Sequence, residues 1–263
     1  NGGLSQVMAG TVAIIEPGLT ATRVIGYSAA ALLLRSRVEQ TYESKAAGAI
    51  VRDLAQQAGV DVATAQEGIS FPAYVVDGAR SVYHHMRDLA ELCGFDLYID
   101  AEGSLVFEKF TGGKAVHVME FAKHILGLEG LRTPPVAGLV EAWGESPTGS
   151  QGDDAWAWLT ADFRGSRGTA GSGARLLLER PVLRTSAASA TAAQAALTDI
   201  KRRTLRGLLR TVGRPQVKLG DAIQLRAMPD DSLNKSFQVR SVVHRIAKAS
   251  GFTTTIGFRA IET

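Results

Sequence analysis

Cysteine is nearly absent from this sequence, and so are long apolar runs. Cys93 is the single cysteine among 263 residues, which excludes an intramolecular disulfide framework and fits folding in a reducing compartment. No apolar run is long enough to span a bilayer, and no signal-peptide pattern stands at the start. The sequence therefore predicts neither a disulfide-stabilised scaffold nor a membrane-spanning protein.

A large excess of charge of one sign is also missing. The chain has 29 basic and 26 acidic residues, for a formal net charge of +3. A dedicated nucleic-acid binder is expected to carry a strongly basic face, so we expect no direct nucleic-acid binding. The hydrophobic content of 45% is enough for one large domain or two modest ones.

Catalytic signatures are missing too. The sequence has no paired carboxylates, nucleophile elbow or zinc-type spacing, which predicts a protein without enzymatic activity and without a cofactor or metal. His84 and Asp88, at i, i+4, are the best metal candidate, but a third ligand is lacking and a solvated helix face is the better interpretation. The glycine-rich stretch 165–173 lacks the Gly-Lys-Ser/Thr ending of a phosphate loop and is predicted to be flexible. Cys93 is interpreted as a buried, inert thiol.

The first half of the chain predicts a hairpin and then a small α/β module. Segments 10–16 and 22–27 are rich in β-forming residues and are separated by the turn signal Pro17-Gly18. Ser44 is a plausible N-cap for a helix that ends near Ala58 before Gly59. An extended segment, a helix and a hairpin are then predicted over 71–76, 80–93 and 95–110.

The middle of the chain gives weaker signals. Residues 111–135 have no clear pattern, and 136–143 are predicted to be a strand. The Gly/Ser/Asp-rich stretch 144–174 is predicted to be a long loop or insertion, with Trp156 and Trp158 as its large anchors.

An alanine-rich helix is predicted over 189–209. It carries a basic cluster at Lys201, Arg202 and Arg203, which Arg206 and Arg210 extend. A solvated helix face is one interpretation, because cations are favoured near a helix C-terminus. An electrostatic contact with DNA or an acidic partner is the other.

A β-meander closes the chain, with strands predicted over 221–226, 237–244 and 252–259. Period-two alternation marks half-buried antiparallel strands. In the second strand it places Phe237, Val239 and Val243 on one face. The other face is polar and is predicted to point outward, as a candidate for partner contacts: Gln238, Arg240 and His244.

Several stretches together resemble the late-control protein D family of phage tails, which is related to the hub portion of VgrG spikes. Segment 10–27 resembles the closing strands of that family's first barrel, and SKAAGAIVRDLAQQAG (44–59) resembles the helix that follows it. The segment from Tyr74 to Phe107 is the closest match. The stretches GRPQVKLGDAIQL and FQVRSVVHRIAKASGFTTTIGFRA resemble the terminal barrel. The family's opening strands are missing, and the 144–174 insertion has no counterpart.

The resemblance implies a mainly β protein with an α/β insert, built from two tail-tube-like β-barrels. The domains expected from it are a remnant of the first barrel (1–43), a helix–hairpin module (44–135) and a second barrel (136–263). It implies a homotrimeric baseplate hub that adapts the hexameric tail tube to the trimeric spike, within a virion tail or injection particle assembled in the bacterial cytoplasm. The start Asn1-Gly2-Gly3 is unlike a natural initiator, so a fragment or processed product is expected.

A binding module is the alternative from a different class. Trp156 and Trp158 are spaced as an exposed recognition pair for carbohydrate or protein, although they could equally fasten the loop to the body. The residues predicted to contact partners are therefore these two tryptophans, the basic cluster and the polar face of the meander.

Overall fold

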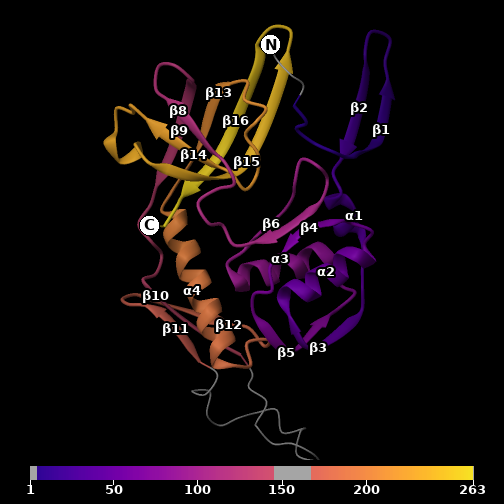
Figure 1. The fold of residues 1–263 in the computed structure, drawn as a ribbon, viewed down its shortest axis with the longest axis vertical. Helices are drawn as coiled ribbons and strands as arrows, with labels where there is room; N and C mark the ends of the chain where they lie inside the picture. The colour runs from indigo at the N-terminus through magenta and orange to yellow at the C-terminus, as the bar shows by residue number, and fades with distance from the viewer. Residues whose placement is uncertain (1–4, 145–166, 263) are drawn as a thin grey trace, which may run out of the picture.

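The computed structural model describes residues 5–144 and 167–262. Two hydrophobic cores organise them, one among the helices and one inside the C-terminal sheet (Figure 1). The predicted mainly β fold with an α/β insert is confirmed. No described helix is long and apolar enough to cross a membrane.

The chain opens with a projecting hairpin of β1 (Thr11–Pro17) and β2 (Thr22–Tyr27). The strands pair antiparallel, which confirms the hairpin predicted from the turn at Pro17-Gly18. Figure 1 shows the hairpin extending away from the helical part, and almost all of its residues are exposed. A two-stranded hairpin is only marginally stable in water, so its own contacts stabilise it weakly.

The helical part begins with α1 (Ala30–Arg35), β3 (Gln40–Ala46), α2 (Ala47–Gln57), β4 (Val62–Ala65) and β5 (Ser70–Val76). The predicted helix is present, but Ser44 is not its N-cap. Ser44 lies in β3 and has φ of 49°. Lys45 and Ala46, which follow it, still pair with β5, so the helix begins only at Ala47. Gly59 follows the helix with φ of +70°, as its predicted role as a stop requires.

The second predicted helix and the hairpin after it are confirmed. α3 (Val82–Cys93) ends at Gly94, whose left-handed backbone has φ of 68°. β6 (Asp96–Ile99) and β7 (Leu105–Glu108) then pair antiparallel, and β4 lies parallel to β7. This places the first residue of β6 at the end of α3, facing the C-terminal sheet.

The stretch 111–135, which the sequence left unassigned, forms two strands of the C-terminal sheet. β8 (Val116–Glu120) pairs parallel with β14, and β9 (Ile125–Arg132) pairs antiparallel with β13. They occupy the two edges of a six-stranded sheet in the order β8-β14-β15-β16-β13-β9. This sheet curls into a half-barrel (Figure 1).

A separate three-stranded sheet packs against the long helix α4 (Ser186–Arg203). β10 (Leu139–Trp143) confirms the predicted strand and pairs with β11 (Gly168–Gly171) and β12 (Arg175–Glu179). Residues 168–171 of the stretch predicted to be flexible therefore form a strand. Gly168 makes this packing fit, because a Cβ there would lie 2.1 Å from the backbone nitrogen of Ala190 in the helix above.

The long helix is shorter at its C-terminal end than predicted. α4 spans Ser186–Arg203 and is capped by Thr185, whose side chain accepts a hydrogen bond from the Ala188 N–H. The chain then becomes β13 (Leu205–Val212), which is hydrogen-bonded on both sides, to β9 and β16. The predicted end at 209 was wrong because pairing with two strands overrides the local helical pattern.

The C-terminal meander is confirmed as β14 (Ala222–Arg226), β15 (Ser236–Ala247) and β16 (Gly251–Ala260), with a short 3-10 turn at Asp231–Leu233. Its predicted faces were wrong beyond Val239. A β-bulge at Arg240 shifts the register, so Val242 packs against the core and Val243 is 60% exposed. One extra residue exchanges the two faces of the strand.

The packing of the two cores does not follow chain order. Residues of β10 and α4 pack in the core of α2 and α3, whereas β8 and β9 belong to the C-terminal sheet. The predicted division at 135/136 stays a prediction about domains. Strand pairing places 116–132 in the C-terminal sheet, and burial places residues of 139–143 and 168–203 in the core of the helical part. Because the partners lie far along the chain, local pattern alone does not indicate this exchange.

We expect Gly48→Ala to destabilise the fold. A Cβ at this position of α2 would lie 2.2 Å from the Gln66 carbonyl oxygen, and backbone cannot move aside cheaply. The expected loss is about 2 kcal/mol, as for an overpacked core. Gly127→Ala is the control, because a Cβ there meets no atom within 4 Å. Urea unfolding should separate the two variants, and equal midpoints would contradict this packing.

Candidate functional site

The polar centre of the described molecule is the carboxylate of Asp96, at the start of β6. Asp96 is buried at 7% exposure in the helical part, yet its hydrogen-bond donors come from the C-terminal sheet. Arg240 Nη1 donates to Oδ1 at 2.5 Å, and Gln238 Nε2 donates to Oδ2. A buried carboxylate needs such partners, so this contact joins the two cores through one side chain.

Gln238 and Arg259 extend the network toward α4. The Gln238 Oε1 accepts a hydrogen bond of 2.8 Å from Arg259 Nε, so both ends of the buried amide are used. Arg259 Nη1 donates to Asp199 Oδ1 at 2.8 Å, and Asp199 also pairs with Arg203 at 2.6 Å. The result is an alternating chain of acidic and basic groups from β6 to the last turn of α4.

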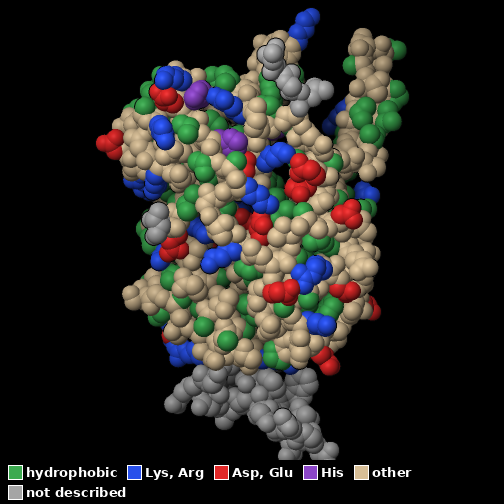
Figure 2. Space-filling view, in the orientation of Figure 1, with side chains coloured by type: hydrophobic (Ala, Val, Ile, Leu, Met, Phe, Trp, Pro, Cys, Tyr) green, Lys and Arg blue, Asp and Glu red, His purple; other side chains and the backbone are tan. Residues whose placement is uncertain are grey.

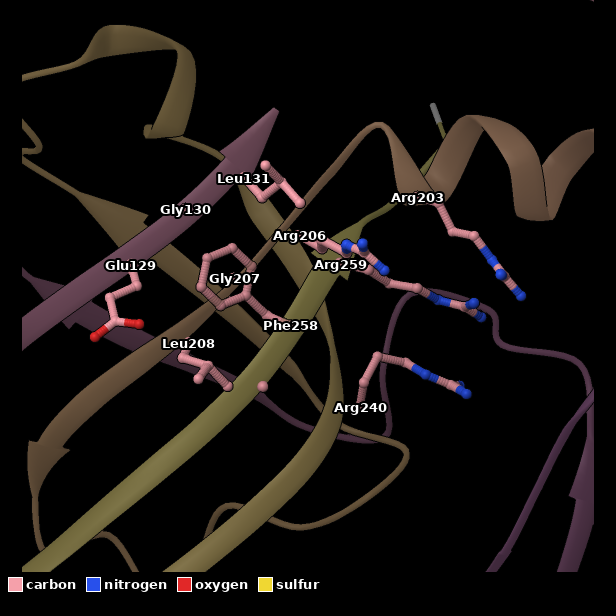
Figure 3. Close-up of a pocket in the computed structure, with 11 residues that line it drawn as sticks. Glu129, Gly130, Leu131, Arg203, Arg206, Gly207, Leu208, Arg240, Phe258 and Arg259 are labelled. Atoms are coloured by element: carbon pink, nitrogen blue, oxygen red, sulfur yellow. The ribbon is translucent and has the colours of Figure 1, made fainter. Parts of the chain in front are cut away.

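Basic groups outnumber acidic ones here. Figure 3 shows the guanidinium groups of Arg203, Arg206, Arg240 and Arg259 extending to the same side, while Glu129 points away at the far end. Burial, and then the nearby Arg240, lower the pKa of Arg259 to about 10. Figure 2 places Lys and Arg side chains at the middle of this face, where the C-terminal sheet meets the helical part.

The predicted basic cluster is divided between two elements. Lys201, Arg202 and Arg203 form the last turn of α4, as predicted. Arg206 and Arg210 were predicted on the same helix, but they lie on β13 with exposed side chains. Lys201 pairs with Glu262 at 2.6 Å, and the Arg202 guanidinium lies 5.9 Å from the centre of the Phe110 ring.

The polar face predicted for β15 does not point outward as a unit. Gln238 is fully buried, because the Asp96 side chain and Arg259 close over it. Arg240 is partly exposed and faces Asp96. His244 is half-buried and its Nδ1 lies 3.0 Å from the Thr254 hydroxyl, while burial lowers the pKa of its ring.

The other candidates have structural surroundings. His84 Nδ1 lies 2.6 Å from the Ser81 hydroxyl and Asp88 pairs with Arg80 at 2.7 Å. Within 5–144 and 167–262, no cluster of three or more His, Cys, Asp and Glu side chains could hold a metal. Cys93 is buried, as predicted. Trp156 and Trp158 lie outside the described residues, so their predicted role remains untested.

Sequence reasoning missed Asp96, Asp199 and Arg259. Asp96 contacts Arg240 across 144 positions of chain, so no local motif links them. The available signal was an acidic residue between Phe95 and Leu97, at a position where a strand was predicted. Acidic residues are rarely buried without partners, but the sequence does not identify the partner.

Exposed apolar side chains are the second feature of the surface. On the hairpin they include Ile15 at 64% and Val24 at 56% exposure. Others lie along four strands of the C-terminal sheet: Val116, Val118, Leu126, Leu131, Leu208, Val212, Val243 and Ile246. These side chains leave apolar surface in contact with solvent in the single chain.

Comparison with solved structures identifies the fold. The chain is similar to a 43 kDa tail protein of prophage MuSo2 from Shewanella oneidensis, with TM-score 0.72 and 12% identity over 96% of this chain and 79% of the other. It is also similar to a tail protein from Neisseria meningitidis, with TM-score 0.67 and 12% identity over 97% and 80%.

A third similar structure belongs to a type VI secretion component of E. coli. The TM-score is 0.60 at 11% identity, over 96% of this chain and 60% of the other, and that protein is itself structurally similar to the T4 tail proteins gp27 and gp5. No family model matches the sequence, and no curated protein matches it. At these identities the likeness establishes a shared fold.

We expect Asp96→Asn to weaken the contact between the two cores. The amide removes the charge that compensates Arg240 and Arg259. Breaking a buried pair costs about 3 kcal/mol or more, and about 2 kcal/mol is expected here because Arg240 is partly exposed. Glu43→Gln, an exposed site on β3, is the control. A free energy of unfolding unchanged by Asp96→Asn would contradict the role given to this carboxylate.

Cys93 should resist alkylation in the folded chain. Burial raises the pKa of its thiol from 9.0 to about 11, although an N–H of Ile69 points at its sulfur. At pH 8 the folded state then holds roughly a hundredfold less thiolate than an ordinary cysteine. The iodoacetamide rate, compared with that in urea, measures this. Equal rates in the two conditions would show an accessible thiol.

Proposed function

We propose that this chain is a structural protein of a phage-type tail or a related injection machine. The observation that carries the proposal is the fold, which matches tail proteins over 96% and 97% of this chain. Fold alone does not assign a function, so the surface must support the same conclusion. The described residues do so by exposing apolar side chains on the hairpin and on the C-terminal sheet.

The specific role that we propose is a baseplate hub of the late-control protein D type, related to the hub portion of VgrG spikes. In it, a homotrimer of two-barrel subunits adapts the hexameric tail tube to the trimeric spike. The half-barrel supports this role because it ends in the unpaired edges of β8 and β9. Strand edges are safest when another chain covers them, and closed symmetric rings cover every copy.

The projecting hairpin supports a role in assembly as well. Its β1 and β2 expose apolar side chains on a two-stranded sheet that is marginal alone. In the proposed hub, β1 and β2 belong to the first barrel and a neighbouring chain covers them. The partners are then tail-tube, spike and other baseplate proteins, and the site of action is the virion tail or particle, assembled in the bacterial cytoplasm.

The proposal includes no catalytic step. In the described part of the chain the titratable groups with shifted pKa values are buried tyrosines, Cys93, paired surface groups, His244 and Arg259. The polar network around Asp96 is instead used to join two cores. We therefore propose a role that depends on shape and contact surfaces.

Light scattering of the purified chain tests the hub. We expect a species near three times the 27.9 kDa chain mass, visible as a ring by electron microscopy. Ile246→Glu should lower that mass, because Ile246 is 79% exposed on β15 and a charge there opposes burial in an interface.

The control for this test is Lys248→Glu, which changes charge beyond the end of the same strand. Unchanged circular dichroism would show that both variants keep the fold. A strict monomer at high concentration, or an equal effect of the two variants, would contradict the proposed ring.

A further inference from the structure

Two hollows meet at the arginine cluster. The smaller, of about 640 Å³, lies over β9, β13 and β16. The larger, of about 940 Å³, runs between α3 and α4 and past residues 133–136. Arg203, Arg240 and Arg259 line both hollows, so the two adjoin at these side chains, and together they are named here the arginine groove.

The arginine groove holds more positive charge than its own carboxylates neutralise. Asp96 and Asp199 are shared among Arg203, Arg240 and Arg259. Arg206 has no ion pair with any described residue, although its side chain lines the smaller hollow. The Arg202 Nε is buried and finds no hydrogen-bond partner in the described part of the chain.

Exposed apolar side chains are part of the lining of both hollows. The smaller hollow is lined by Leu131 and Leu208, which are 47% and 48% exposed. In the larger hollow Val136 is 82% exposed and Leu176 is 40% exposed. A ligand that fills the groove therefore needs negative charge at its middle and apolar groups at either end.

We propose that the arginine groove binds an extended segment of a partner protein, in which neighbouring carboxylates are flanked by apolar side chains. The planar guanidinium of arginine binds carboxylates with two parallel hydrogen bonds, which suits the unpaired Arg206. A nucleic acid repeats its charge at every phosphate, whereas the unpaired Arg206 here lies beside the apolar side chains of Leu131 and Leu208. This proposal does not rest on the hub, because it concerns a groove within a single chain.

A labelled peptide tests the proposal on the full chain. The probe is a fluorescein-labelled hexapeptide with two adjacent glutamates between a valine and a leucine on each side, and its control carries glutamine at both acidic positions. We expect saturable binding of the glutamate peptide, weakened in roughly 0.5 M salt by screening, and little binding of the glutamine peptide. Equal binding of the two peptides, or no binding of either, would overturn the proposal.

Two matched variants locate the site. Arg206→Glu should weaken peptide binding roughly tenfold or more, because it reverses the charge that lacks a partner. Arg210→Glu, on the same strand but outside both hollows, should change it less than about twofold. Equal losses in the two variants would indicate general charge attraction and reject the groove.

Val136→Asp examines the larger hollow, where a new carboxylate should repel the acidic peptide and lower affinity several-fold. An unchanged affinity would restrict binding to the smaller hollow and reject an extended segment. A labelled oligothymidylate is the last arm, and tighter binding of it than of the peptide would assign the groove to nucleic acid. Light scattering of the same samples tests the proposed hub independently, because a monomeric chain can still bind the peptide.

Discussion

The burial of one carboxylate between two cores is the constraint on which this structure depends. Asp96 belongs to the helical part, but Gln238 and Arg240 of the C-terminal sheet supply its hydrogen bonds. A charge in that position costs several kcal/mol unless it is paired, so the arrangement that brings the donors to it is favoured. Gln238 and Arg240 are two residues apart on β15, so both can reach the same carboxylate.

The arginines follow from the same constraint. Arg259 reaches Asp199 while contacting Gln238, and Arg203 reaches Asp199 from within α4. This arrangement holds several guanidinium groups in fixed positions next to two hollows. Arg206, left without a counter-charge among the described residues, is then available to a ligand. A network that joins the cores thus also prepares a surface for an acidic partner.

The rest of the described surface includes many exposed apolar side chains. The hairpin of β1 and β2 and the end of β15 leave large apolar side chains exposed in the single chain, including Ile15 and Ile246. The open edges at β8 and β9 add unpaired backbone groups. A tail component that works within a larger assembly can have such surfaces, because neighbouring chains remove them from water.

Local pattern determined the hairpin at the start, α2, α3, the β6–β7 hairpin and the meander, because turn residues and apolar periodicity act over a few positions. Tertiary structure alone decided that 205–212 is a strand, that 116–132 borders the C-terminal sheet and that Gln238 is buried. Each of these depends on partners distant in sequence: β13 lies between β9 and β16, and Gln238 meets Asp96 across 142 positions. The basic residues could be identified from the sequence, but their gathering into a groove required the fold.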